Sequence, residues 1–109
     1  MPTLSYGTAK VIGEYLLNDY ARRGFIDGRA LRFPGVVVRP PAPNGALSAF
    51  NSDLIREPLA GWPIVSPVSA EARIWVQSIG TAVRNLIHAA NTPAAAWGTH
   101  RAVTLPPCR

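Results

Sequence analysis

Residues 5–38 read SYGTAKVIGEYLLNDYARRGFIDGRALRFPGVVV, and this stretch decides the fold class. In its first half, apolar side chains recur at helical spacing, which predicts a helix over residues 3–23 with a wide apolar arc. Gly24 is a natural stop for that helix. The second half predicts two short strands, over residues 30–33 and 36–38. A helix that leads into strands indicates the α/β class.

The rest of the chain continues this alternation of helices and strands. The apolar spacing predicts further helices over residues 48–59 and 78–90, and strands over 64–65, 73–77 and 102–105. The segment Arg39–Gly45 contains three prolines and a glycine, so it is expected to be a loop. With 109 residues the chain is long enough for one small domain.

Composition and charge exclude several classes of function. The net charge is +5, but the arginines are scattered and no nucleic-acid-binding motif accompanies them, so we expect no nucleic-acid partner. No apolar run reaches the length of a membrane span, and no secretory signal is visible at the start. With a single cysteine, the chain is expected in the reducing cytoplasm. His88, His100 and Cys108 lie too far apart in sequence to suggest a metal site.

The sharpest chemical feature is the pair Tyr6 and Lys10. Residues at i and i+4 share one face of a helix, one turn apart. A nearby ammonium stabilises the charged form of a phenol, which prepares a tyrosine for proton transfer near neutral pH. The pair therefore indicates a general acid/base tuned by a lysine. The plainer alternative is two unrelated residues on a helix surface.

The motif and its surroundings resemble a known enzyme family. Ser5–Lys10 followed by Val11–Glu14 is similar to the catalytic helix of the extended short-chain dehydrogenase/reductases, the NAD-dependent epimerase/dehydratase family. Leu31–Val36 resembles the strand that follows that helix. Two further segments, Arg39–Gly61 and Arg73–Ala89, resemble the D-erythronate dehydrogenase branch of the family.

The resemblance implies the C-terminal part of a Rossmann-like, doubly wound parallel sheet with part of the small substrate-binding lobe. It implies one partial domain over residues 1–109. In it, residues 1–38 form the catalytic helix and the next strand, and residues 39–109 form substrate-lobe segments with a returning strand and helix. The Gly-rich cofactor loop of the family has no counterpart in this sequence. We therefore expect a fragment that is inactive on its own.

The resemblance also implies a cofactor, a substrate class and residue roles. The cofactor is NAD, with NADP as the alternative, and the substrate is a small sugar acid such as D-erythronate. Tyr6 is the expected general acid/base, and Lys10 binds the nicotinamide ribose. The expected cofactor contacts are Tyr6, Lys10, Phe33, Pro34, Gly35 and Val36. The expected substrate contacts are Asn44, Ser48, Arg73 and Trp75.

Two other functions stay open, as does the association state. Ile74 and the pair Ile79–Gly80 stand where nucleotide-sugar epimerases and dehydratases of the family carry acidic residues, which disfavours a nucleotide-sugar substrate. A fragment of such an enzyme remains one alternative, and a non-catalytic interaction protein is the other. The wide apolar arc of the first helix predicts a homodimer or a self-associating fragment.

Overall fold

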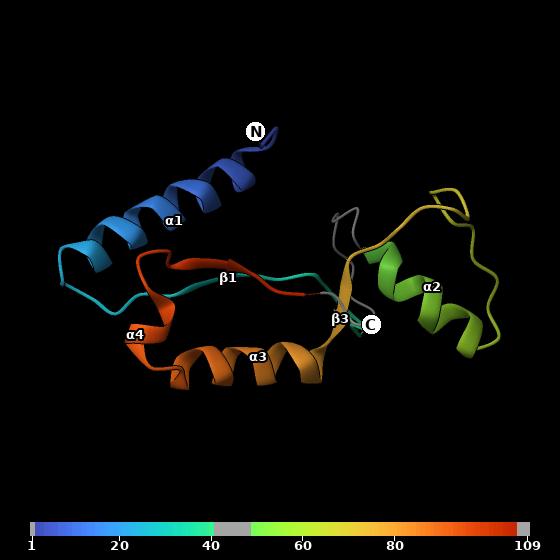
Figure 1. Cartoon of the computed structure of the whole chain (residues 1–109). Coiled ribbons are helices and arrows are strands. Elements are labelled where there is room, and N and C mark those ends of the chain that lie inside the picture. The colour runs from blue at the N-terminus through green and yellow to red at the C-terminus, as the bar shows by residue number, and fades with distance from the viewer. Residues whose placement is uncertain (1, 41–48, 107–109) are drawn as a thin grey trace. The chain divides into compact units, whose positions relative to one another are not determined.

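The computed structural model describes residues 2–40 and 49–106 and confirms the α/β class (Figure 1). The helices are α1 (Ser5–Arg22), α2 (Phe50–Leu59), α3 (Ile79–Asn91) and α4 (Ala94–Trp97). The strands are β1 (Ala30–Arg32), β2 (Gly35–Val37), β3 (Val76–Ser78) and β4 (Ala102–Thr104). The strand predicted at Ile64–Val65 does not form. Prolines flank it on both sides, and Val65 is 90% exposed.

The described residues divide into two compact units, each with its own parallel strand pair. One unit contains the residues up to Arg32 together with Asn85–Leu105, and its strands β1 and β4 are paired. The other contains Phe33–Arg84 and Pro106, and its strands β2 and β3 are paired. The boundary between the units falls inside α3. The single partial domain over residues 1–109 stays a prediction.

In the first unit, α1 lies antiparallel to the strand that follows it (Figure 1). The sheet register pairs Ala30 with Ala102 and Arg32 with Thr104. Gly24 takes a φ of 75°, a conformation that favours glycine, and so ends α1 as predicted. Arg22 and Arg23 both pair with Asp19 at the negative end of that helix.

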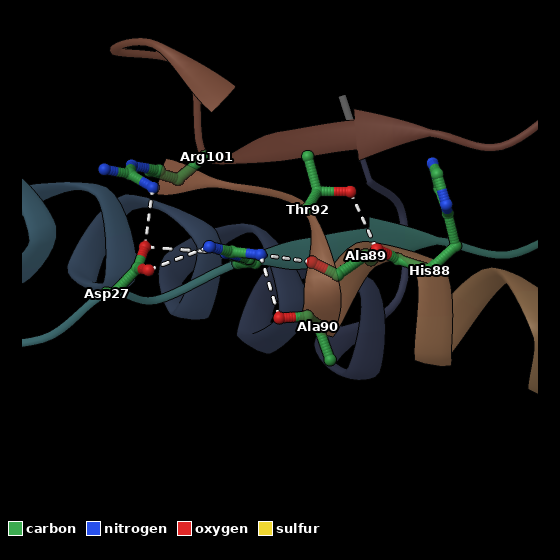
Figure 2. Close-up of polar contacts among 7 residues, drawn as sticks. Asp27, His88, Ala89, Ala90, Thr92 and Arg101 are labelled. Atoms are coloured by element: carbon green, nitrogen blue, oxygen red, sulfur yellow. Dashed lines mark hydrogen bonds and ion pairs between the residues drawn. The ribbon is translucent and has the colours of Figure 1, made fainter. Parts of the chain in front are cut away.

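An arginine clamp holds the end of α3 in the first unit (Figure 2). Arg29 donates hydrogen bonds to the carbonyl oxygens of Ala89 and Ala90, which are acceptors left open at the helix end. Its guanidinium also lies 5.4 Å from the Trp97 ring centroid. Asp27 bridges the guanidinium groups of Arg29 and Arg101, at 2.8 Å from each. The clamp therefore connects the residues before β1 to the end of α3.

The ion pairs of Asp27 with Arg29 and Arg101 predict that the first unit is less stable at low pH. Hydrogen bonds from Arg29, with attraction from Arg101, hold the pKa of Asp27 below its ordinary value. The ionised carboxylate then contributes stability above its unfolded-state pKa, and this contribution is lost as the pH falls through the lower folded-state pKa. We expect the thermal midpoint to fall on acidification below about pH 4, and to fall less steeply in Asp27→Asn. Equal slopes for the two proteins in a thermal melt series would contradict this role.

In the second unit, α2 is fastened to the segment after β2. The Ser52 hydroxyl is buried and accepts a hydrogen bond from the Arg39 N–H at 3.1 Å. Arg56 donates to the Arg39 carbonyl oxygen and also pairs with Asp53 and Glu57. These contacts fix the backbone of Arg39 against α2. Residues 41–48, which follow shortly after, lie outside the described part of the chain.

The apolar faces of α1 and α3 are largely uncovered in the described residues. No side chain of α1 is buried, and Ile12 and Leu16 are 53% and 56% exposed. On α3 the buried positions are Ala82 and Ala89, whereas the predicted apolar face stays about half exposed. Two strands of three residues each offer too little surface to cover a helix face. The wide apolar arc of α1 is thus uncovered in this chain, and the homodimer or self-associating fragment expected from it stays a prediction.

Candidate active site

Tyr6 and Lys10 lie together in the first two turns of α1. The ammonium nitrogen of Lys10 is 5.3 Å from the centroid of the Tyr6 ring, over its face. The Tyr6 side chain is 72% exposed, so its hydroxyl is open to a bound molecule. An ammonium this close to an aromatic ring is held by the negative ring face and places positive charge beside the phenol. The predicted i, i+4 contact is confirmed as a contact; its chemical role stays a prediction.

The direction of α1 places Tyr6 and Lys10 beyond the carboxyl ends of strands β1 and β4. Near the strand starts, Asn18 accepts a hydrogen bond from the Arg101 N–H at 3.0 Å. One turn earlier in the helix, Glu14 meets Arg32, the last residue of β1. Lys10 and Tyr6 lie one and two turns earlier still, so they extend toward and beyond the carboxyl ends of these strands. Ligands of open α/β sheets bind in that region.

Glu14 of α1 and Arg32 of β1 form a bidentate ion pair. Arg32 Nε donates to Glu14 Oε1 at 2.8 Å, and Arg32 Nη2 donates to Glu14 Oε2 at 2.6 Å. These hydrogen bonds hold the pKa of Glu14 below its ordinary value. Neither residue was predicted to have a role, although Glu14 stands four residues after Lys10 and so shares its helix face.

The predicted cofactor strand lies in the second unit. Pro34 is buried, and the Gly35 N–H donates to the Trp75 carbonyl oxygen at 2.9 Å. Because proline has no N–H and that of Gly35 is engaged, neither position has a free backbone N–H donor. The structure thus brings Trp75 beside Gly35, and the roles of Phe33, Pro34, Gly35 and Val36 stay predictions.

The substrate residues predicted in the second unit are placed only in part. Arg73 is exposed and Trp75 is 40% exposed, both just before β3. Asn44 and Ser48 lie outside the described residues. Asn51, which was not among the predicted contacts, lies near Gly35: its side-chain nitrogen would be 3.4 Å from a β-carbon there. That is an ordinary contact distance, and the strand pattern alone gave no signal of this neighbour.

The predicted site residues therefore form two groups. Tyr6 and Lys10 belong to the first unit, with Glu14 and Arg32 beside them. Residues 33–36, Arg73 and Trp75 belong to the second. Each group lies in its own unit, and the functional roles of its residues stay predictions.

Two kinds of feature are absent from residues 2–40 and 49–106. No cluster of three or more His, Cys, Asp or Glu side chains is placed to hold a metal ion. None of the helices there combines the length and apolarity needed to cross a membrane.

Comparison with known proteins supports the resemblance seen in the motifs. The chain is 45% identical over 105 residues to a D-erythronate dehydrogenase of Haemophilus influenzae and 48% identical over 105 residues to one of Cupriavidus necator. Each match covers 96% of this chain but only 33% and 32% of the respective relative. An uncharacterized epimerase/dehydratase of Staphylococcus aureus is 39% identical over 49 residues, which is 45% of this chain and 15% of that protein. No protein-family model matches the chain.

The D-erythronate dehydrogenases thus match nearly the whole chain, and the chain spans about a third of their length. The α/β architecture with short parallel strand pairs is compatible with part of a Rossmann-like sheet. The resemblance predicted from the Tyr6–Lys10 helix and the strand after it is confirmed: this chain is similar, over 96% of its residues, to D-erythronate dehydrogenases.

Proposed function

We propose that this chain supplies the proton-transfer pair of an NAD(P)-dependent oxidoreductase that acts on a small sugar acid such as D-erythronate. One observation carries the proposal. An exposed tyrosine with a lysine ammonium over its ring lies past the carboxyl edge of a parallel strand pair. The similarity to D-erythronate dehydrogenases over nearly the whole chain supports it.

In this mechanism Tyr6 moves a proton and Lys10 prepares it to do so. With the Lys10 ammonium beside its ring, Tyr6 accepts the proton of the substrate hydroxyl during oxidation and returns it during reduction. A bound nicotinamide supplies the hydride acceptor. Lys10 also donates hydrogen bonds to the nicotinamide ribose. Its ammonium is available for this because both carboxylate oxygens of Glu14 are bonded to Arg32.

The other predicted contacts, for cofactor and substrate, belong to the second unit. The backbone of Phe33–Val36 contacts the nicotinamide of the cofactor. Arg73 binds the substrate carboxylate, since an exposed guanidinium matches a carboxylate with two parallel hydrogen bonds. Trp75, Asn44 and Ser48 contact the rest of the sugar acid. No metal takes part.

The pyrophosphate of the cofactor needs a Gly-rich turn at a helix start, which this sequence lacks. The relatives are about three times as long as this chain, so the proposed activity requires the part of the enzyme that the match leaves out. We therefore propose that the isolated chain is inactive. Nicotinamide chemistry and a single cysteine favour a cytoplasmic location.

Two observations keep a second and a third function in view. The similarity to an epimerase/dehydratase supports a nucleotide-sugar enzyme, although Ile74 and Ile79–Gly80 oppose it. The uncovered apolar side chains of α1 support a non-catalytic interaction protein.

The substrate proposal is tested with a chimera in which this chain replaces the 105 matched residues of the Cupriavidus necator relative. We expect the chimera to form NADH from NAD and D-erythronate, because the chain contributes the proton-transfer pair and the carboxylate site. The isolated chain is the control and should show no turnover. Turnover of nucleotide-linked sugars alone would favour the epimerase/dehydratase alternative over a sugar-acid enzyme.

A further inference from the structure

Three charged or polar side chains follow one another along a single stripe of α1. Tyr6, Lys10 and Glu14 are spaced four residues apart, so each lies one helical turn from the next. Lys10 therefore has two possible partners, a phenol on one side and a carboxylate on the other. In an isolated helix a lysine and a glutamate at this spacing attract each other. The carboxylate thus competes with the phenol for the ammonium.

In the structure, Arg32 of β1 binds the Glu14 carboxylate in place of Lys10. Both carboxylate oxygens of Glu14 accept hydrogen bonds from Arg32, at 2.8 and 2.6 Å. Two parallel charge-assisted bonds form one of the strongest side-chain pairings available to a carboxylate. The ammonium of Lys10 lies instead over the Tyr6 ring, 5.3 Å from its centroid.

We propose that Arg32 is a positioning residue that occupies Glu14 and thereby keeps the Lys10 ammonium beside Tyr6. Arg32 acts through Glu14 and touches neither member of the proton-transfer pair. The catalytic meaning of this arrangement rests on the proposed function. The arrangement itself is a property of the chain and is measurable without any activity.

The single lysine of the chain makes a direct test possible. Lysine labelled with ¹³C at the ε-carbon gives one methylene signal, and the ring current of Tyr6 shifts its protons upfield. Tyr6→Leu defines the unshifted position. In Arg32→Gln the released Glu14 carboxylate attracts Lys10, so we expect most of the upfield shift to be lost.

Glu14→Gln separates this proposal from a simple tether between α1 and β1. Glu14→Gln and Arg32→Gln break the same ion pair, but only Arg32→Gln leaves a carboxylate that competes for Lys10. We expect the upfield shift to persist in Glu14→Gln and to return in the double variant. A tether predicts that the shift is lost in all three.

Arg22→Gln is the matched control, because it breaks another arginine–carboxylate pair of the same helix, with Asp19. The Lys10 signal of the Arg22→Gln variant should keep its upfield shift. Circular dichroism of each variant reports whether α1 is retained. An unchanged shift in Arg32→Gln, or a lost shift in Glu14→Gln with α1 intact, overturns the proposal. Neither result depends on turnover, so the proposed enzymatic function can fail or succeed separately.

Discussion

Replacing Tyr6 with phenylalanine should reduce turnover of the chimeric enzyme by about 10²- to 10⁴-fold, the usual contribution of a positioned general acid/base. The change removes one hydroxyl and keeps the ring on which the Lys10 ammonium lies. Cofactor binding should therefore survive. The measurements are steady-state turnover of D-erythronate and the dissociation constant for NADH by fluorescence.

Tyr15→Phe is the matched control for this prediction. Tyr15 lies on the same helix and is 73% exposed, against 72% for Tyr6, so the two substitutions disturb α1 equally. Turnover should stay near normal in Tyr15→Phe. Near-normal turnover in Tyr6→Phe would refute the proton-transfer role of Tyr6, and an equal loss in both variants would point to damage to the helix.

The purified chain should associate with itself through α1. Ile12 and Leu16 follow one another by one turn and are 53% and 56% exposed, with Tyr20 continuing the stripe at 48%. Because each of these aliphatic side chains is about half exposed, covering the rest of it contributes about 1 kcal/mol, and two from each copy contribute about 4 kcal/mol toward association. Light scattering coupled to size-exclusion chromatography should give twice the 11.7 kDa chain mass or more.

Ile12→Glu/Leu16→Glu should return the chain to a monomer, because it places charges in the apolar stripe. Leu59→Glu is the control, since Leu59 is 84% exposed but belongs to the other unit. It should leave the mass unchanged. If the unmodified chain is a monodisperse monomer with a sharp cooperative melt, association through α1 is wrong and the interaction-protein alternative gains weight.

The positions of the helices were more predictable from the sequence than the packing of helices and strands against one another. The helix from Ser5 to Arg22 follows from its apolar spacing and from Gly24, which are properties of neighbouring residues. Ile64–Val65 has the residue types of a strand but finds no partner among the described residues. Strand formation depends on a neighbouring strand, which residue type alone does not provide.

In the candidate site, too, contacts within one helix were predictable from the sequence, whereas contacts between elements far apart in sequence were not. The contact between Tyr6 and Lys10 was predictable, because both lie on one helix face. The partner of Glu14 was not, because Arg32 is 18 positions away and meets Glu14 only when α1 lies against β1. The approach of Asn51 to Gly35 likewise depends on how α2 and β2 pack.

The division of the chain into two units has a consequence for the order of folding. The first unit joins residues up to Arg32 with Asn85–Leu105, and the stretch Phe33–Arg84 between them belongs to the second. Pairing Ala30 with Ala102 must close a loop of about two thirds of the chain, and the length-dependent entropy of that closure is about 4 kcal/mol. The contacts between β2 and β3 span a shorter separation, so they have the lower contact order. Kinetically, the inserted stretch should therefore become structured first, and the β1–β4 pair should form late, after its two distant segments have met.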